Sequence, residues 1–183
     1  MKRFGVITII LIFIVASLAC QISGGPKPPR TLAISQAESK AFEQALTKAQ
    51  LDLQTGFVSV VLTETQVSSY ITYNMTPEFS KYLRNPLVYF ETNQIHIYGT
   101  YLGEAVEVDG RIILDVSVVN QAPKFSIVAA EFGPVPVPSF ILNTLTEQLD
   151  KEVAKALAKN TTGYQLEKIT LATGTLTITM KKK

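Results

Sequence analysis

Residues 105–119 read AVEVDGRIILDVSVV, and this stretch decides the fold class. Apolar side chains recur at every second position, and polar ones stand mostly between them. The apolar set is Val106, Val108, Ile112, Leu114, Val116 and Val118, and the polar set is Glu107, Asp109, Arg111, Asp115 and Ser117. Such alternation predicts a long antiparallel strand with one apolar and one polar face. Gly110, in its middle, predicts a bulge or a sharp bend.

The sequence around this strand predicts further strands and two longer helices. Three- and four-residue spacing of apolar positions indicates helices over residues 35–54 and 138–159. Thr63 and Gln66 have capping-box spacing for a short helix that ends near Tyr73, and a helical turn follows, closed by Pro86. The other predicted strands cover residues 57–63, 87–91, 94–101, 124–132, 164–172 and 175–180, with tight turns at Thr92-Asn93 and Thr173-Gly174. The class is therefore α+β.

The run FGPVPVPSFILNTL, residues 132–145, connects a predicted strand to a predicted helix. Prolines at every second position favour an extended connection that cannot lie inside a central strand ladder. Pro138 or Ser139 then begins the helix. Phe140, Ile141 and Leu142 follow in succession, and they cover most of a helical turn, so one flank of this helix should face something other than the sheet.

The N-terminus resembles an export signal. Residues 1–19 combine a basic start with an uncharged apolar run that is shorter than the ~20 residues a membrane-spanning helix needs. ASLAC resembles the lipobox of bacterial lipoproteins, with Cys20, the only cysteine, as the lipid-modified residue. Ser17 and Ala19 also satisfy the rule for ordinary signal peptidase, and the alternative is a secreted protein with a free thiol. Residues 20–34 are expected to form a flexible tether and residues 35–183 a single domain.

The composition excludes several classes of function. Without residues 1–19 the chain carries 15 basic and 15 acidic residues, so no nucleic-acid partner is expected. The single histidine, His96, has no GxSxG motif beside it, and no phosphate loop or metal-ligand spacing occurs. We therefore expect no catalytic residues, no metal, no cofactor and no enzyme activity.

The order of elements resembles the small bacterial members of the tubular lipid-binding superfamily, which includes bactericidal/permeability-increasing protein. The similarity covers roughly residues 35–181. Its most specific parts are Leu62-Thr63-Glu64 before the short helix and the aliphatic-proline run before the long one. The resemblance implies a long, curved antiparallel sheet wrapped around the long helix of the C-terminal half, with an N-terminal helix beside it. It also implies a groove that holds acyl chains, without catalysis.

On this interpretation two sets of apolar side chains would line the groove. The sheet would contribute Val108, Ile112, Leu114 and Val116, and the helix would contribute Phe140, Ile141, Leu145 and Leu149. The expected partners are the membrane, through the lipid on Cys20, and a phospholipid or fatty-acyl ligand. The expected location is the extracytoplasmic side of the cell membrane. The alternative is an envelope lipoprotein whose solid α+β domain is a scaffold for a protein partner.

Overall fold

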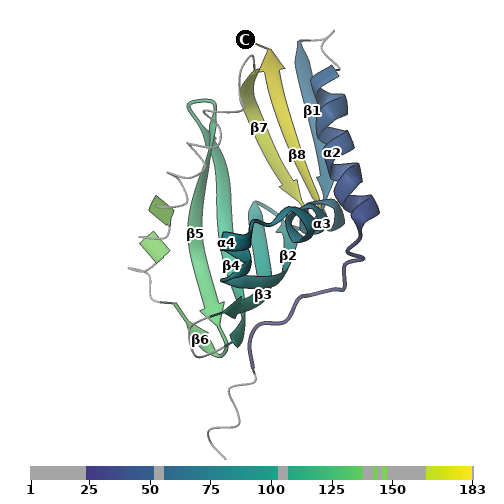
Figure 1. Ribbon diagram of the computed structural model, residues 1–183. Helices are drawn as coiled ribbons and strands as arrows, with labels where there is room; N and C mark the ends of the chain where they lie inside the picture. Colours follow the sequence, from purple (N-terminus) through teal and green to yellow (C-terminus); the bar gives the residue numbers. More distant parts are fainter. Residues whose placement is uncertain are drawn as a thin grey trace, which may run out of the picture.

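Most of the described chain lies in strands (Figure 1). The computed structural model describes residues 24–51, 56–102, 107–137, 142–143, 146–147 and 164–182. Its helices are α2 (Gln36–Leu51), α3 (Glu64–Asn74) and the single turn α4 (Pro77–Ser80). Its strands are β1 (Phe57–Thr63), β2 (Leu83–Glu91), β3 (Gln94–Leu102), β4 (Glu107–Val119), β5 (Ala122–Phe132), β6 (Val135–Pro136), β7 (Tyr164–Ala172) and β8 (Thr175–Lys182).

The strands form two antiparallel sheets and not one. The first sheet has three strands in the order β1-β8-β7, and the second has five in the order β2-β3-β4-β5-β6. β1 pairs with β8 from Phe57 opposite Lys181 to Thr63 opposite Thr175. The chain leaves β1 directly into α3 and begins the second sheet only afterwards, so strands that are close in sequence belong to different sheets.

The prediction of one long, curved sheet wrapped around a long helix is therefore wrong, although the broader α+β class fits. Among the described helices, α2 packs on β1, and α3 packs on β2 and β1. Of the helix predicted over residues 138–159, four residues are described, and all four are helical: Leu142, Asn143, Thr146 and Glu147. The rest of that helix lies outside the described residues.

The core of the first sheet forms against α2. In β1 alternate residues are buried, and Val58, Val60 and Leu62 are at most 4% exposed. The helix contributes Phe42, Ala45, Leu46 and Ala49 at the spacing that predicted it. β8 adds Leu176, Ile178 and Met180 to the same face. One row of apolar side chains therefore runs across this sheet, and α2 covers its β1 side.

The predicted capping box at the start of α3 is confirmed. Thr63 has extended backbone angles, its hydroxyl accepts a hydrogen bond from Gln66 N at 3.2 Å, and Gln66 Oε1 accepts one from Thr63 N at 2.9 Å. Such a cap stabilises a helix by ~1 kcal/mol. Here it also turns the chain sharply at the end of β1, and it thereby sets the position of Glu64, the first helical residue.

The long strand predicted in the second sheet is confirmed, and so are the two predicted two-residue turns, one in each sheet. β4 has 13 residues and pairs with β3 and β5 along its length. Asn93 in the β2–β3 turn has φ 65°, and Gly174 in the β7–β8 turn has φ 85°. Asparagine and glycine tolerate this left-handed region better than other residues, which is why these pairs signal turns in the sequence.

Two local predictions in this sheet are wrong. The register shift between β4 and β5 lies at Ile113 and Leu114, and its extra residue, Val128, belongs to β5, whereas Gly110 pairs regularly with Gly99 and Phe132. A Cβ on Gly110 would lie 2.5 Å from a ring carbon of Phe132, so the glycine makes room for that ring and is not the site of a bulge. The helical turn predicted up to Pro86 ends at Ser80, and β2 already begins at Leu83, with the proline inside a bulge of the strand.

The proline-rich connection lies at an edge of the second sheet, in agreement with its sequence. Val135 pairs with Phe132 and Pro136 with Glu131, which makes β6 a two-residue edge strand. Farther along β5, Ile127 N donates a hydrogen bond to Thr146 Oγ1 at 2.9 Å. The described residues of the following segment therefore lie beside β5.

Candidate functional site

The predicted sheet residues do share one face of the second sheet. Leu114 is buried, and Val108, Ile112 and Val116 are half-buried on the same side of β4. Of these four, Val116 lines a pocket. The other predicted residues, Cys20, Phe140, Ile141, Leu145 and Leu149, lie outside the described residues.

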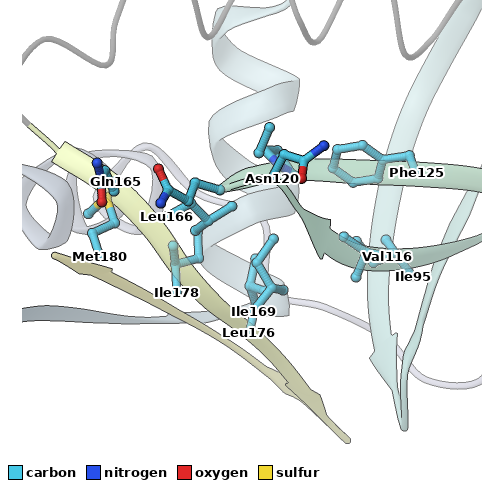
Figure 2. Close-up of a pocket in the computed structure, with 13 residues that line it drawn as sticks. Ile95, Val116, Asn120, Phe125, Gln165, Leu166, Ile169, Leu176, Ile178 and Met180 are labelled. Carbon is cyan, nitrogen blue, oxygen red and sulfur yellow. The ribbon is translucent and has the colours of Figure 1, made fainter.

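The pocket lies between the two sheets and has a volume of about 440 Å³ (Figure 2). One wall comes from β7 and β8 of the first sheet, and the other comes from β3, β4, β5 and the β4–β5 turn. The described lining residues are Ile95, Val116, Asn120, Gln121, Ala122, Pro123, Phe125, Gln165, Leu166, Ile169, Leu176, Ile178 and Met180. Its volume is in the ~300–1,000 Å³ range of small-molecule sites.

The pocket continues the apolar face of the first sheet beyond the part that α2 covers. Leu176, Ile178 and Met180 pack against the α2 core and also line the pocket. On β7 a register shift between Leu166 and Lys168 lets both Leu166 and Ile169 face the pocket. Because α2 covers only the β1 side of this face, the β7 side is available to the pocket.

The lining is apolar except for three uncharged amides. Asn120, Gln121 and Gln165 are the polar side chains among the described lining residues, which include no charged group. Asn120 and Gln121 form the β4–β5 turn with φ values of 51° and 63°. Two successive left-handed residues make the turn that suits a two-residue hairpin, but glutamine adopts this conformation only with strain. The site therefore suits an apolar ligand with at most an uncharged polar end.

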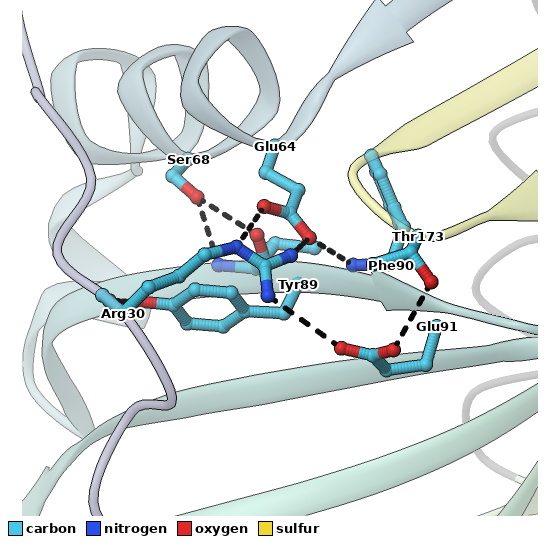
Figure 3. A network of polar contacts seen from close by, with 8 residues as sticks. Arg30, Glu64, Ser68, Tyr89, Phe90, Glu91 and Thr173 are labelled. Atoms are coloured by element: carbon cyan, nitrogen blue, oxygen red, sulfur yellow. Dashed lines mark hydrogen bonds and ion pairs between the residues drawn. The ribbon is translucent and has the colours of Figure 1, made fainter.

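A buried polar network lies at the junction of the two sheets (Figure 3). Glu64 is 4% exposed. Its carboxylate accepts two hydrogen bonds from Arg30, from Nε at 3.0 Å and from Nη2, and a third from Phe90 N at 2.8 Å. Tyr89 OH donates to Arg30 O, and the Arg30 guanidinium lies 5.1 Å above the Tyr89 ring. We call the Arg30–Glu64 pair the clasp.

The clasp joins four parts of the fold. Arg30 belongs to the segment before α2, Glu64 begins α3, Phe90 lies in β2, and Gly174 lies in the β7–β8 turn. Glu64 N donates to Gly174 O at 3.4 Å, and Gly174 N donates to Phe90 O at 3.0 Å. The first sheet is thereby held to the second beside the β7–β8 turn, where Leu171 packs with Val88 and Phe90. The clasp therefore lies at the junction of the two sheets that form the pocket walls.

The network contains no arrangement suited to nucleophilic catalysis among the described residues. Ser68 is fully buried, but its hydroxyl accepts from Val88 N at 2.8 Å and donates to Val88 O at 3.3 Å, so it is occupied by the backbone of β2. The carboxylate of Glu64 raises the pKa of Arg30 further, and burial raises the pKa of Tyr89. Both groups therefore keep their ordinary protonation states at neutral pH.

His96 lies on the opposite face of the second sheet from the pocket, in β3 opposite Tyr89. Its Nε2 is 3.3 Å from Gln94 Oε1. Burial, and next the positive charge of Arg111, lower the pKa of His96 below its usual value. Within the described ranges there is no cluster of three or more metal-ligating side chains.

Sequence reasoning missed the clasp because Arg30 falls in the glycine- and proline-rich stretch expected to be a tether. Leu62-Thr63-Glu64 was singled out by the resemblance alone, and no pattern indicated a buried partner for Glu64 that is 34 residues away. None of the helices in the described part of the chain is long and apolar enough to cross a membrane. Comparison with models of protein families gives no match, and no curated protein is similar enough in sequence to be a relative.

Proposed function

We propose that the protein binds a single lipid acyl chain in the pocket between its two sheets, without catalysis. The observation that carries this proposal is a pocket of about 440 Å³ whose described lining is apolar apart from three uncharged amides. A ligand in such a pocket is held by removal of its surface from water and not by a charged contact. The lack of a charged lining residue in the described part favours a hydrocarbon chain over a phosphate or carboxylate group.

The size of the pocket favours one chain. At ~30 Å³ for a group the size of a methylene or a water, the pocket holds about fifteen methylene groups. Burial of ~0.8 kcal/mol per methylene then contributes roughly 12 kcal/mol. Association costs at least ~4 kcal/mol, which leaves at most about 8 kcal/mol and a dissociation constant that is micromolar or weaker.

We propose further that the protein is an exported lipoprotein, held at the extracytoplasmic side of the cell membrane by acylation of Cys20. This part rests on the lipobox-like sequence ASLAC and on the position of the only cysteine. Mass spectrometry of the purified protein tests it: the mature N-terminus should carry acyl mass, and a mature N-terminus without that mass contradicts it.

The ligand is tested with the chain expressed without residues 1–20. Native mass spectrometry and organic extraction should recover a non-covalent single-chain lipid, or a phospholipid with one chain inserted. The same protein should bind a fluorescent fatty acid. A lipid-free protein that also fails to bind the fatty acid contradicts the proposal, and it favours the alternative function of a solid scaffold for a protein partner.

Two neighbouring substitutions on β7 make the test specific to the pocket. Ile169 lines the pocket, whereas Thr170 is exposed on the other face of the strand. Ile169→Asp introduces a charge into the apolar wall and should reduce fatty-acid binding more than tenfold, because burying an unpaired carboxylate is costly. Thr170→Asp should bind as the unmodified protein does. Circular dichroism on both variants checks that the fold is retained, and equal binding by the two folded variants contradicts the location.

A further inference from the structure

One end of the second sheet carries the start of the described chain. Gly24, Gly25 and Pro26 line a hollow of about 350 Å³ together with Gly133, Pro134 and other residues of the β5–β6 region. The packing here is close, since a Cβ on Gly25 would lie 2.3 Å from Asp109 O. Asp109 O also accepts a hydrogen bond from Gly133 N at 2.8 Å. The first described residues are thus docked against the β5–β6 turn and the start of β4.

The chain then runs along the second sheet to the clasp and on into α2 (Figure 1). Tyr89 is fully buried beneath this segment, with Arg30 above its ring. Ser35 N donates a hydrogen bond to the buried Ser69 Oγ at 3.2 Å. Residues 24–35 are therefore held at both ends and near the middle, which fixes the point from which the preceding residues must start.

The predicted anchor lies only four residues before Gly24. Four residues of extended chain reach at most about 14 Å. With the lipid on Cys20 as the anchor, the bilayer lies within about that distance of Gly24. The end of the sheet that carries Gly24 is then the end closest to the membrane.

Exposed side chains at this end are of the kinds that suit a membrane surface. Val135, in β6, is 62% exposed, and Pro134 and Pro136 beside it are exposed as well. Tyr82 is 67% exposed, and its carbonyl accepts a hydrogen bond from Leu102 N at 2.9 Å, at the end of β3 that pairs with the start of β4. Tyrosine with an apolar ring and a polar hydroxyl is enriched where membranes meet water.

Two lysines at this end have their side chains free to meet a membrane surface. Lys27 and Lys81 are exposed and have no ion-pair partner among the described residues. Two nearby carboxylates are in ion pairs, Glu107 with Arg84 at 3.0 Å and Glu131 with Arg111 at 3.0 Å. Asp109 accepts a hydrogen bond from the Thr100 hydroxyl at 2.9 Å and keeps its charge. Basic side chains near an anionic membrane surface are attracted to it.

We propose that this end of the second sheet, with Tyr82 and Val135 as its apolar contacts, lies on the bilayer that anchors the protein. The ten residue steps from Gly110 to Asn120 span about 33 Å of strand, so the end of the pocket that the β4–β5 turn lines is the end far from that bilayer. The proposal rests on the proposed anchor and not on the proposed ligand. Its consequence is that the pocket exchanges lipid with a second membrane or a carrier and not with the anchoring bilayer.

The absence of tryptophan from the chain provides a clean test. Val135→Trp and Tyr82→Trp each introduce a single tryptophan at the proposed contact. Val119→Trp is the matched control, because Val119 is 46% exposed at the far end of β4. The full chain is reconstituted into vesicles of phosphatidylethanolamine and phosphatidylglycerol with brominated acyl chains, and vesicle association is checked by flotation. Tryptophan fluorescence should be quenched at positions 135 and 82, and should not be quenched at position 119.

Each other result overturns the proposal. Floating protein that is quenched equally at position 119, or at none of the three positions, overturns the orientation and leaves the pocket proposal intact. Protein that does not float overturns the anchor and the orientation together. A further variant tests the docking itself: Gly25→Val cannot pack against Asp109, and it should reduce quenching at position 135. Unchanged quenching in a folded Gly25→Val protein overturns the role assigned to residues 24–26.

Discussion

Replacing Arg30 by glutamine tests whether the clasp holds the fold together. Its two partners differ in burial, since the side chain of Glu64 is 5% exposed and that of Arg30 is 37% exposed. Arg30→Gln leaves a buried carboxylate whose remaining hydrogen bond among the described residues comes from Phe90 N. Removing one partner of a buried ion pair costs about 3–5 kcal/mol. Because Arg30 is partly exposed, we expect a loss of about 3 kcal/mol in the free energy of unfolding.

Glu64→Gln should lower the free energy of unfolding by less than Arg30→Gln does. Glutamine keeps an oxygen to accept the Phe90 N–H, and the unpaired Arg30 can turn toward water. The lost charge-assisted hydrogen bonds should cost about 1.5–3 kcal/mol, toward the lower end of that range. The double variant should lose less than the sum of the two single losses, because the partners act on each other. We therefore expect the loss of Arg30, the more exposed partner, to lower the free energy of unfolding more than the loss of Glu64.

Urea denaturation followed by circular dichroism measures these differences, with the m-value checked for constancy. Arg84→Gln is the matched control. Its pair with Glu107 is more than half exposed on both sides, so the loss should stay below ~1 kcal/mol. The reasoning is refuted if Arg30→Gln costs no more than Arg84→Gln, or if Glu64→Gln costs more than Arg30→Gln.

Three further outcomes are expected. Gly110→Ala should lower the free energy of unfolding by about 1–3 kcal/mol in urea titrations, because the new Cβ meets the Phe132 ring at 2.5 Å and the backbone oxygen of Glu131 at 2.7 Å; no loss would contradict the close packing at this position. The pKa of His96 is lowered in the folded state, so the unfolded chain takes up the proton first as the pH falls. The free energy of unfolding should therefore be constant above pH ~6.5 and decrease below it. Urea midpoints measured across this pH range should lose that decrease in His96→Gln. Gln121→Gly should relieve the backbone strain at φ 63° and raise the free energy of unfolding by up to ~1 kcal/mol, seen as a higher melting temperature. A lower melting temperature would contradict the claim that Gln121 is strained.

The sequence determined the elements whose signals are local. Alternation marked β4, the Thr63–Gln66 spacing marked the cap of α3, and the Thr92-Asn93 and Thr173-Gly174 pairs marked two hairpin turns. Each of these depends on the conformations and hydrogen bonds of residues a few positions apart. For the same reason alternation identified the apolar face of β4, since the side-chain period of a strand is independent of its partners.

Only the tertiary structure decided what those faces meet. β1 pairs with β8, from Thr63 opposite Thr175, and no local signal encodes a pairing over such a separation. The same holds for Arg30 and Glu64, and for Gly110, whose role depends on a ring brought by β5. Val116 lines the pocket while Leu114, two residues earlier on the same face, is buried in packing. Periodicity gives the direction of a side chain, and the pairing of distant strands decides whether that direction leads to a core or to a cavity.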